Sequence, residues 1–135
     1  MTSLFDSLQL GSLNLPNRIL MAPLTRARAG REAMPNELMA RYYAQRAGAG
    51  LIISEATGIT REGLGWPGAP GLWSEAQVDG WKLITDAVHR EGGRIVAQLW
   101  HMGRLVHPDL GRGRPFSSSA TTATPFPHTY EGNKP

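Results

Sequence analysis

Residues 51–57 read Leu-Ile-Ile-Ser-Glu-Ala-Thr, and this short apolar run directly follows two glycines, Gly48 and Gly50. A run of this length and character predicts a strand that is buried on both faces of a sheet. Similar runs occupy residues 19–22, which Pro23 terminates, and residues 95–99. The sequence therefore predicts three strands in succession, the first two of them buried.

Helical patterns fill both intervals between these strands. Asn36 is a suitable N-cap for the first helix, and Gly48 and Gly50 predict its end. Ser74 and Gln77 have the spacing of a capping box for the second helix, which Gly92-Gly93 end. Apolar residues repeat at helical spacing in both, which predicts a buried face on each helix. These residues are Leu38, Met39, Tyr42, Tyr43, Val78, Trp81, Ile84 and Val88.

The segments outside this core differ in character. Apolar residues alternate around Gly11-Ser12, which predicts a β-hairpin within residues 1–16. After Trp100 the chain is rich in Gly, Pro, Ser and Thr, and we expect no further helix. The order hairpin, strand, helix, strand, helix, strand predicts an α/β fold with parallel strands and right-handed crossovers. It fits half of a doubly wound sheet or the first part of a (β/α)₈ barrel.

Composition limits the class of protein. The chain has 135 residues, of which 41% are hydrophobic and 19% charged, as expected for one globular domain. It contains no cysteine, which excludes disulfide scaffolds and thiol catalysis. The net charge of +3 is scattered, so we expect no nucleic-acid partner. With no apolar run that could span a bilayer and no signal-peptide pattern, we expect no membrane association and a cytoplasmic location.

Ligands of both candidate folds bind at the carboxyl ends of parallel strands. In this chain those ends are residues 22–25, 55–57 and 98–101. No Gly-x-Gly-x-x-Gly pattern and no P-loop follows the first strand, which disfavours a nucleotide-binding sheet. The chemistry is therefore expected from the polar residues at the three strand ends.

Three polar residues stand out there. The amide of Gln98 could pair with a ring edge that presents an acceptor beside an N–H, such as the pyrimidine edge of a flavin; alternatively, neighbours or water satisfy it inside a barrel. The Thr25 hydroxyl could donate to a ligand carbonyl or satisfy the local backbone. Glu55 is buried by pattern and needs a partner, for which Arg94 is one candidate.

Aromatic and imidazole side chains give weaker signals. Trp66 and Trp100 could form the wall of a pocket, or they could serve packing alone. His101 and His107 lack metal-ligand spacing to another histidine or acid, so each is expected to face solvent or to be hydrogen-bonded. The sequence therefore predicts no metal site.

Four blocks, in register and in order, resemble the Old Yellow Enzyme family of flavin-dependent ene-reductases. The blocks are residues 16–18 with 21–26, residues 51–57, residues 68–72, and residues 94–101 with Gly103-Arg104. The resemblance runs from about Leu4 to the tail and is strongest to bacterial members that reduce enones, maleimides and nitro compounds. It implies a (β/α)₈ barrel with FMN over its mouth and NADH or NADPH as hydride donor.

The resemblance also implies roles for individual residues. Pro23 and Leu24 would present backbone groups to the flavin, and Ala56 would add a backbone contact. Thr25 would hydrogen-bond the flavin carbonyl next to the reactive nitrogen and tune its potential. Gln98 would bind the pyrimidine edge.

The substrate pocket would be lined in part by two tryptophans, Trp66 and Trp100. Trp66 falls where relatives often carry a tyrosine, so a hydroxyl contact is lost there. The resemblance implies an activated alkene as the substrate, reduced at its C=C bond.

A whole (β/α)₈ barrel needs about 250 residues, so the chain is expected to form the amino-terminal portion of one barrel domain. Within it, residues 1–16 form the hairpin, 17–101 three strands and two helices, and 102–135 an irregular segment leading to the lid region. Two open sheet edges favour partner binding. We expect the remaining C-terminal part of the barrel to be a separate chain of a split or nicked enzyme, and a homo-oligomer is possible. The alternative is a catalytically inactive barrel fragment without flavin.

Overall fold

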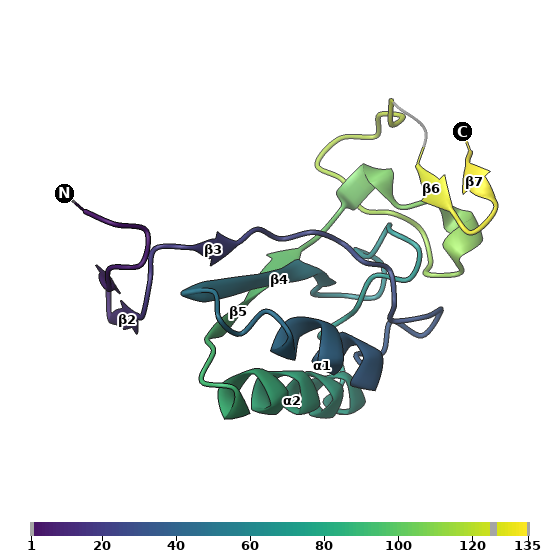
Figure 1. Cartoon of the computed structure of the whole chain (residues 1–135). Helices are drawn as coiled ribbons and strands as arrows, with labels where there is room; N and C mark the ends of the chain where they lie inside the picture. Colours follow the sequence, from purple (N-terminus) through teal and green to yellow (C-terminus); the bar gives the residue numbers. More distant parts are fainter. Residues whose placement is uncertain (1, 125–126, 135) are drawn as a thin grey trace.

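A parallel sheet of three strands in the order β3-β4-β5 forms the centre of the chain (Figure 1). The computed structural model describes residues 2–124 and 127–134. Its helices are α1 (Glu37–Ala44) and α2 (Glu75–Arg90), with two 3₁₀ turns, η1 (Gly103–Leu105) and η2 (Pro108–Leu110). Its strands are β1 (Leu8–Leu10), β2 (Leu13–Leu15), β3 (Leu20–Met21), β4 (Leu51–Gly58), β5 (Ile95–Trp100), β6 (His128–Thr129) and β7 (Gly132–Asn133).

The amino-terminal hairpin is confirmed. Strands β1 and β2 pair antiparallel, with Leu10 opposite Leu13 across the Gly11-Ser12 loop. Gly11 has a φ of +58°, a conformation that favours glycine because it lacks a Cβ atom. In Figure 1 the hairpin lies to the left, away from the helices.

The parallel pairing and the burial of β4 are confirmed, but the expected burial of β3 is wrong, and β5 is exposed as well. Leu20 pairs with Leu51, and Ile52 pairs with Ile95. Every residue of β4 is buried or half-buried, whereas Leu20 on β3 is 45% exposed and Leu99 on β5 is 61% exposed. The reason is that β3 and β5 are edge strands and the two helices cover only one face of the sheet (Figure 1).

Both helices begin where their caps predict. The Asn36 side chain accepts a hydrogen bond from the Met39 backbone, and Ser74 and Gln77 form the reciprocal capping box. Helix α1 ends at Ala44, earlier than the glycines suggested. Beyond it, the N–H groups of Arg46, Ala47 and Ala49 each bond the carbonyl three residues back, so the chain reaches β4 through tight turns.

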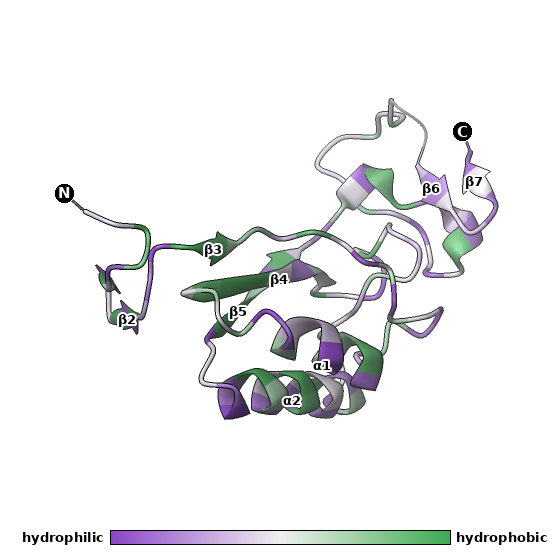
Figure 2. Ribbon diagram, in the orientation of Figure 1, coloured by the Kyte–Doolittle hydropathy of each residue, from purple (hydrophilic) through white to green (hydrophobic). Residues whose placement is uncertain are grey.

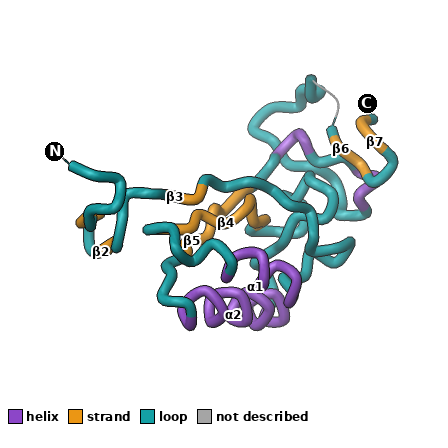
Figure 3. Tube along the Cα trace, in the orientation of Figure 1, coloured by secondary structure: helices purple, strands orange, loops and turns teal. Residues whose placement is uncertain are grey.

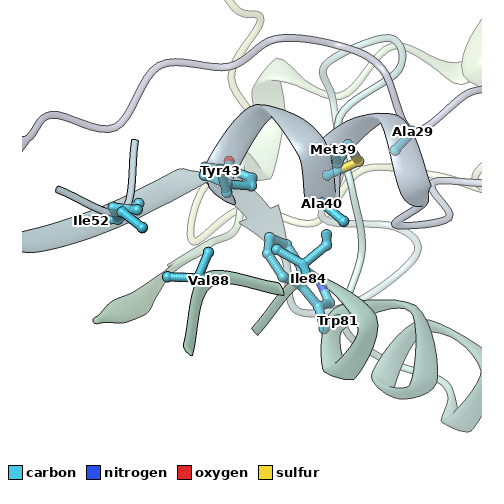
Figure 4. Close-up of a cluster of buried hydrophobic side chains, with 9 residues drawn as sticks. Ala29, Met39, Ala40, Tyr43, Ile52, Trp81, Ile84 and Val88 are labelled. Atoms are coloured by element: carbon cyan, nitrogen blue, oxygen red, sulfur yellow. The ribbon is translucent and has the colours of Figure 1, made fainter. Parts of the chain in front are cut away.

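The hydrophobic core lies between the two helices and the sheet (Figure 4). Tyr43 from α1 and Ile52 from β4 are fully buried, as are Ile84 and Val88 from α2. Figure 2 shows that most of β4 is hydrophobic. Leu38 is the exception to the predicted buried faces, because it is 56% exposed on α1. Tyr42 is half-buried and packs on the core cluster, with its ring centroid 3.9 Å from the Arg46 guanidinium.

The long loop between β4 and α2 packs through a second, smaller cluster. Leu64 and Ala69 from this loop are fully buried against Ala33, with Trp66 and Trp73 packed on them. Backbone hydrogen bonds join the loop to the end of β4, from Gly58 to the Pro70 carbonyl and from Leu72 to the Gly58 carbonyl. The loop is therefore an ordered part of the fold.

The segment after Trp100 holds more structure than its composition predicts. It contains η1, η2 and the short antiparallel hairpin β6–β7 (Figure 3). The Lys134 ammonium donates to Asp109 at 2.9 Å and lowers the pKa of that carboxyl. This ion pair ties the end of the chain to η2. Such contacts between distant residues leave no mark in a pattern of Gly, Pro, Ser and Thr.

Glu55 is buried in β4, as its position predicts, but Arg94 is not its partner. Its Oε2 accepts from the backbone N–H groups of Arg26 at 2.9 Å and Ala27 at 3.3 Å, while Oε1 accepts from the Tyr43 hydroxyl at 3.2 Å. Burial raises the pKa of Glu55. These hydrogen bonds and the nearby positive charge of Arg26 both oppose the rise. Backbone donors and a phenol thus replace the expected arginine.

Ile84→Ala is expected to destabilise the protein by about 2–5 kcal/mol, because it leaves a cavity in the core between α2 and β4. Chemical denaturation measures the change in the free energy of unfolding. The matched control is Leu83→Ala on the same helix, where the side chain is 40% exposed and little burial is lost. Equal losses for the two variants would contradict this account of the core.

The raised pKa of Glu55 predicts a pH dependence of stability. The unfolded chain releases this proton near the ordinary value of 4.5, and the folded protein releases it at higher pH. Between these two pKa values the folded state binds more protons, so the contribution of Glu55 to stability falls as the pH rises.

Comparison with Glu55→Gln isolates this contribution. We expect the free energy of unfolding of the wild type, minus that of the variant, to decrease as the pH rises from 4.5. Other titrating groups, Asp109 among them, cancel in the difference. A difference that increases over this range would show that the hydrogen bonds outweigh burial.

Candidate functional site

The carboxyl ends of β3, β4 and β5 lie at one edge of the sheet, because the three strands are parallel. Ala56 pairs directly with Gln98 across β4 and β5. Pro23, Leu24 and Thr25 follow β3 at the same edge. The structure therefore brings together five of the seven residues that the sequence and the resemblance single out.

Gln98 presents its side chain on the exposed surface of β5. Its backbone N–H donates to the Ser54 hydroxyl at 3.1 Å, close to a register shift between Ile53 and Ala56 of β4. Within residues 2–124 and 127–134, no protein group hydrogen-bonds its carboxamide. The alternative of a glutamine satisfied by neighbouring side chains is therefore not observed in this part of the chain.

Thr25 is half-buried, and among the described residues its hydroxyl has no hydrogen-bond partner. The alternative of a hydroxyl that satisfies the local backbone is therefore not observed there either. The backbone N–H groups of the next two residues, Arg26 and Ala27, are bound by Glu55. The backbone next to Thr25 is thus fixed by hydrogen bonds, while its hydroxyl makes none within the described residues.

The remaining three residues, Ala56, Pro23 and Leu24, have apolar side chains. Ala56 is 7% exposed, and its methyl side chain leaves little bulk beside Gln98. Pro23 is half-buried, and Leu24 is 58% exposed. All three are apolar and belong to the carboxyl ends of β3 and β4.

The two tryptophans lie in different surroundings. Trp100 ends β5 opposite Gly58, and its carbonyl accepts from the Ile59 N–H. Trp66 packs on the cluster of the long loop, and its ring centroid lies 4.1 Å from that of His128 at the start of β6. Each is half-buried. Trp66 thus connects the long loop to β6, while Trp100 stands at the strand ends with Gln98.

A hollow of about 650 Å³ lies just beyond β5. It is lined by residues 101–105, 116–118 and 122–124, which include Arg104, Phe116 and two serines. His101 at its rim is exposed, and its Nδ1 accepts from the Gly103 N–H. The segment after β5 thus forms this hollow by itself, and the residues that line it do not include Thr25, Ala56 or Gln98.

Sequence reasoning missed the connections beneath this edge. The Ser54 hydroxyl donates to the Glu55 carbonyl and accepts from Gln98, and Tyr43 of α1 binds Glu55. The one available signal was the polarity of Ser54 and Glu55 within an apolar run. Their partners come from other elements, so no local pattern identifies them.

Two classes of feature are absent from the described part of the chain. None of its helices is long and apolar enough to cross a membrane. In the same residues, no group of three or more His, Asp or Glu side chains is arranged to hold a metal ion.

Comparison with known proteins places this geometry in context. A model of the NADH:flavin oxidoreductase / NADH oxidase family matches residues 3–131. A flavin oxidoreductase of Emericella nidulans is 45% identical over 122 residues, which are 86% of this chain and 31% of the relative. The chain spans about a third of the length of the relatives it matches.

Solved structures show the same similarity. An Old Yellow Enzyme homologue from Zymomonas mobilis is 60% identical, with a TM-score of 0.94, over 99% of this chain and 38% of the other. Morphinone reductase in complex with tetrahydroNAD is 47% identical, with a TM-score of 0.88, over 98% of this chain and 38% of the other.

These findings confirm the resemblance to the Old Yellow Enzymes, whose fold is a (β/α)₈ barrel. The described sheet itself is open, with three parallel strands and helices on one face. Proteins of this family use FMN, with NAD(P)H as the hydride donor. From the match over residues 3–131 and the agreement of fold and sequence, the chain belongs to the NADH:flavin oxidoreductase / NADH oxidase family.

Proposed function

We propose that this chain forms the amino-terminal part of an FMN-dependent NAD(P)H:alkene oxidoreductase that reduces activated C=C bonds. The observation that carries the proposal is the register of the sheet. It pairs Ala56 with Gln98 at the edge where β3 delivers Thr25, and both polar side chains lack protein partners among the described residues.

The residues at this edge fit a flavin ring in their chemistry. The Gln98 carboxamide offers a donor beside an acceptor, which matches the alternating acceptor and N–H groups of a pyrimidine edge. The Thr25 hydroxyl offers a donor for a ring carbonyl. The small Ala56 and the apolar Pro23 and Leu24 suit a flat, mostly apolar ring between the two polar groups.

The role of this chain is to bind and orient the cofactor and to form one side of the substrate pocket. When bound, FMN supplies a ring that accepts hydride from NADH or NADPH and passes it to the β-carbon of the activated alkene. Gln98 would hold one end of the ring, and Thr25 would donate to the carbonyl beside the reactive nitrogen. Trp100 and Trp66 would line the pocket for enones and related substrates.

The proton for the α-carbon and the groups that activate the substrate carbonyl would come from the rest of the barrel. The open sheet supports this proposal. Its edge strands expose the apolar side chains of Leu20, Val96 and Leu99, which the rest of a barrel would cover. We propose that the remaining part of the barrel covers these residues. Assembly into a homo-oligomer and a cytoplasmic location remain predictions.

The alternative function is that of an inactive barrel fragment without flavin. It differs from the enzyme in one measurable property. Flavin absorbance in the protein purified with the remaining part of the barrel supports the oxidoreductase. Failure of the complete barrel to retain FMN supports the inactive fragment.

Gln98→Ala is expected to weaken FMN binding by about tenfold or more, because two hydrogen bonds to the ring edge are lost. Titration of the flavin-free protein with FMN measures the dissociation constant. Gln45→Ala, at an exposed glutamine just after α1, is the matched control and should bind FMN as the wild type does. Equal dissociation constants for Gln98→Ala and the wild type would exclude this role.

Thr25→Ala is expected to slow the reduction of bound flavin by NAD(P)H about two- to tenfold. A hydroxyl that donates to the ring carbonyl stabilises the negative charge of the reduced ring, so its removal lowers the flavin potential. Stopped-flow measurement of the half-reaction tests this. Thr25→Ser keeps the hydroxyl and should restore most of the rate. An unchanged rate in Thr25→Ala would exclude the role.

A further inference from the structure

The segment that follows β3 is held from below by one buried carboxylate. Glu55 is 1% exposed, and its Oε2 accepts from the backbone N–H groups of Arg26 and Ala27, the two residues after Thr25. Hydrogen bonds to a charged acceptor are stronger than neutral ones. The main chain beside the Thr25 hydroxyl is therefore bound at two consecutive residues by a single side chain.

The bound segment contains an unfavourable backbone conformation. Ala27 has a φ of +56°, in the left-handed region that residues with a Cβ atom rarely adopt. Such a residue persists only where surrounding contacts hold it in place. One contact is Glu55. Another is the Ala29 N–H, which donates to the Gly68 carbonyl at 2.8 Å.

Glu55 is itself fixed by a tyrosine from the helical layer. The Tyr43 hydroxyl donates to Oε1 at 3.2 Å, and its oxygen accepts from the Glu55 backbone N–H at 2.8 Å. Tyr43 is fully buried in the core between α1, α2 and the sheet. These two hydrogen bonds restrict both the carboxylate and its backbone, so the position of the segment is tied to the core.

Glu55 cannot take part in chemistry at the strand ends by direct contact. Both of its oxygens bond protein groups, and the residue lies almost wholly beneath the surface. Its carboxylate reaches the segment that carries Thr25 through the N–H groups of Arg26 and Ala27. The geometry is that of a residue that positions another residue.

We propose that Glu55 and Tyr43 are positioning residues that hold the backbone after β3 so that the Thr25 hydroxyl faces the flavin. This inference rests on the proposed role of Thr25. It adds a pair of residues that never touch the ring but determine where its hydrogen-bond donor stands.

Amide hydrogen exchange tests the hold on the backbone without flavin. In Glu55→Gln a neutral amide replaces the carboxylate at the same volume, and its NH₂ group must face either the two backbone N–H groups or the Tyr43 hydroxyl. We expect exchange at Arg26 and Ala27 to become about tenfold faster. Tyr43→Phe, which removes only the hydroxyl, should give a smaller change and serves if Glu55→Gln does not fold.

Ile84→Ala is the matched control for a general loss of stability. Ile84 packs in the same core as Tyr43, but its aliphatic side chain cannot hydrogen-bond the backbone at Arg26 and Ala27. Ile84→Ala should accelerate amide hydrogen exchange in α2. The exchange rates at Arg26 and Ala27, each divided by the exchange rate for global unfolding of the same variant, should stay unchanged. Unchanged exchange at Arg26 and Ala27 in both Glu55→Gln and Tyr43→Phe would overturn the proposal.

The flavin potential of the complete, FMN-loaded protein provides the second readout. We expect Glu55→Gln to shift it in the same direction as Thr25→Ala and by a smaller amount, whereas Ile84→Ala should leave it unchanged. The proposal would also be overturned if Glu55→Gln accelerates exchange but leaves the flavin potential unchanged while Thr25→Ala shifts that potential. If Thr25→Ala has no effect, the proposed role of Thr25 fails, and hydrogen exchange alone decides whether Glu55 holds the segment.

Discussion

Burial of β4 is the constraint on which the rest of this structure depends. The strand pairs with β3 on one side and β5 on the other. Its Ile52 side chain packs into the core between the sheet and the helices α1 and α2. A strand in this position has no access to water for its polar groups, so each must find a partner within the protein. The sequence of β4 nevertheless places Ser54, Glu55 and Thr57 there, all of them buried.

The way these polar groups are satisfied organises the edge of the sheet. The Ser54 and Thr57 hydroxyls both donate to the Glu55 carbonyl, and Ser54 also accepts from the Gln98 backbone. The Glu55 carboxylate binds the backbone after β3. The interior hydrogen bonds are thus taken by β4 and the main chain of its neighbours, and the side chains of Thr25 and Gln98 stay free of protein partners in the described chain.

The same arrangement leaves two faces of different character. On one face of the sheet, α1 and α2 enclose a core in which Tyr43, Trp81 and Ile84 belong to one cluster with Ile52 of β4 (Figure 4). On the edge strands, Leu20, Val96 and Leu99 remain exposed. A large apolar surface of this kind favours cover by more protein, in keeping with a chain that spans about a third of its barrel-forming relatives.

The sequence by itself determined the elements and their order, because caps, glycines and apolar periodicity act over a few residues. Asn36, Ser74 and Gln77 marked both helix starts, and the apolar runs marked three parallel strands. Gln98 and Thr25 were identified as candidates because a polar residue at a strand end is visible locally. The partner of Glu55, the exposure of β5, the exposure of Leu38 and the hairpin at residues 128–133 were decided only by the tertiary structure. Each depends on which distant segments meet in space, and burial and hydrogen bonding between such segments leave no periodic trace in the chain.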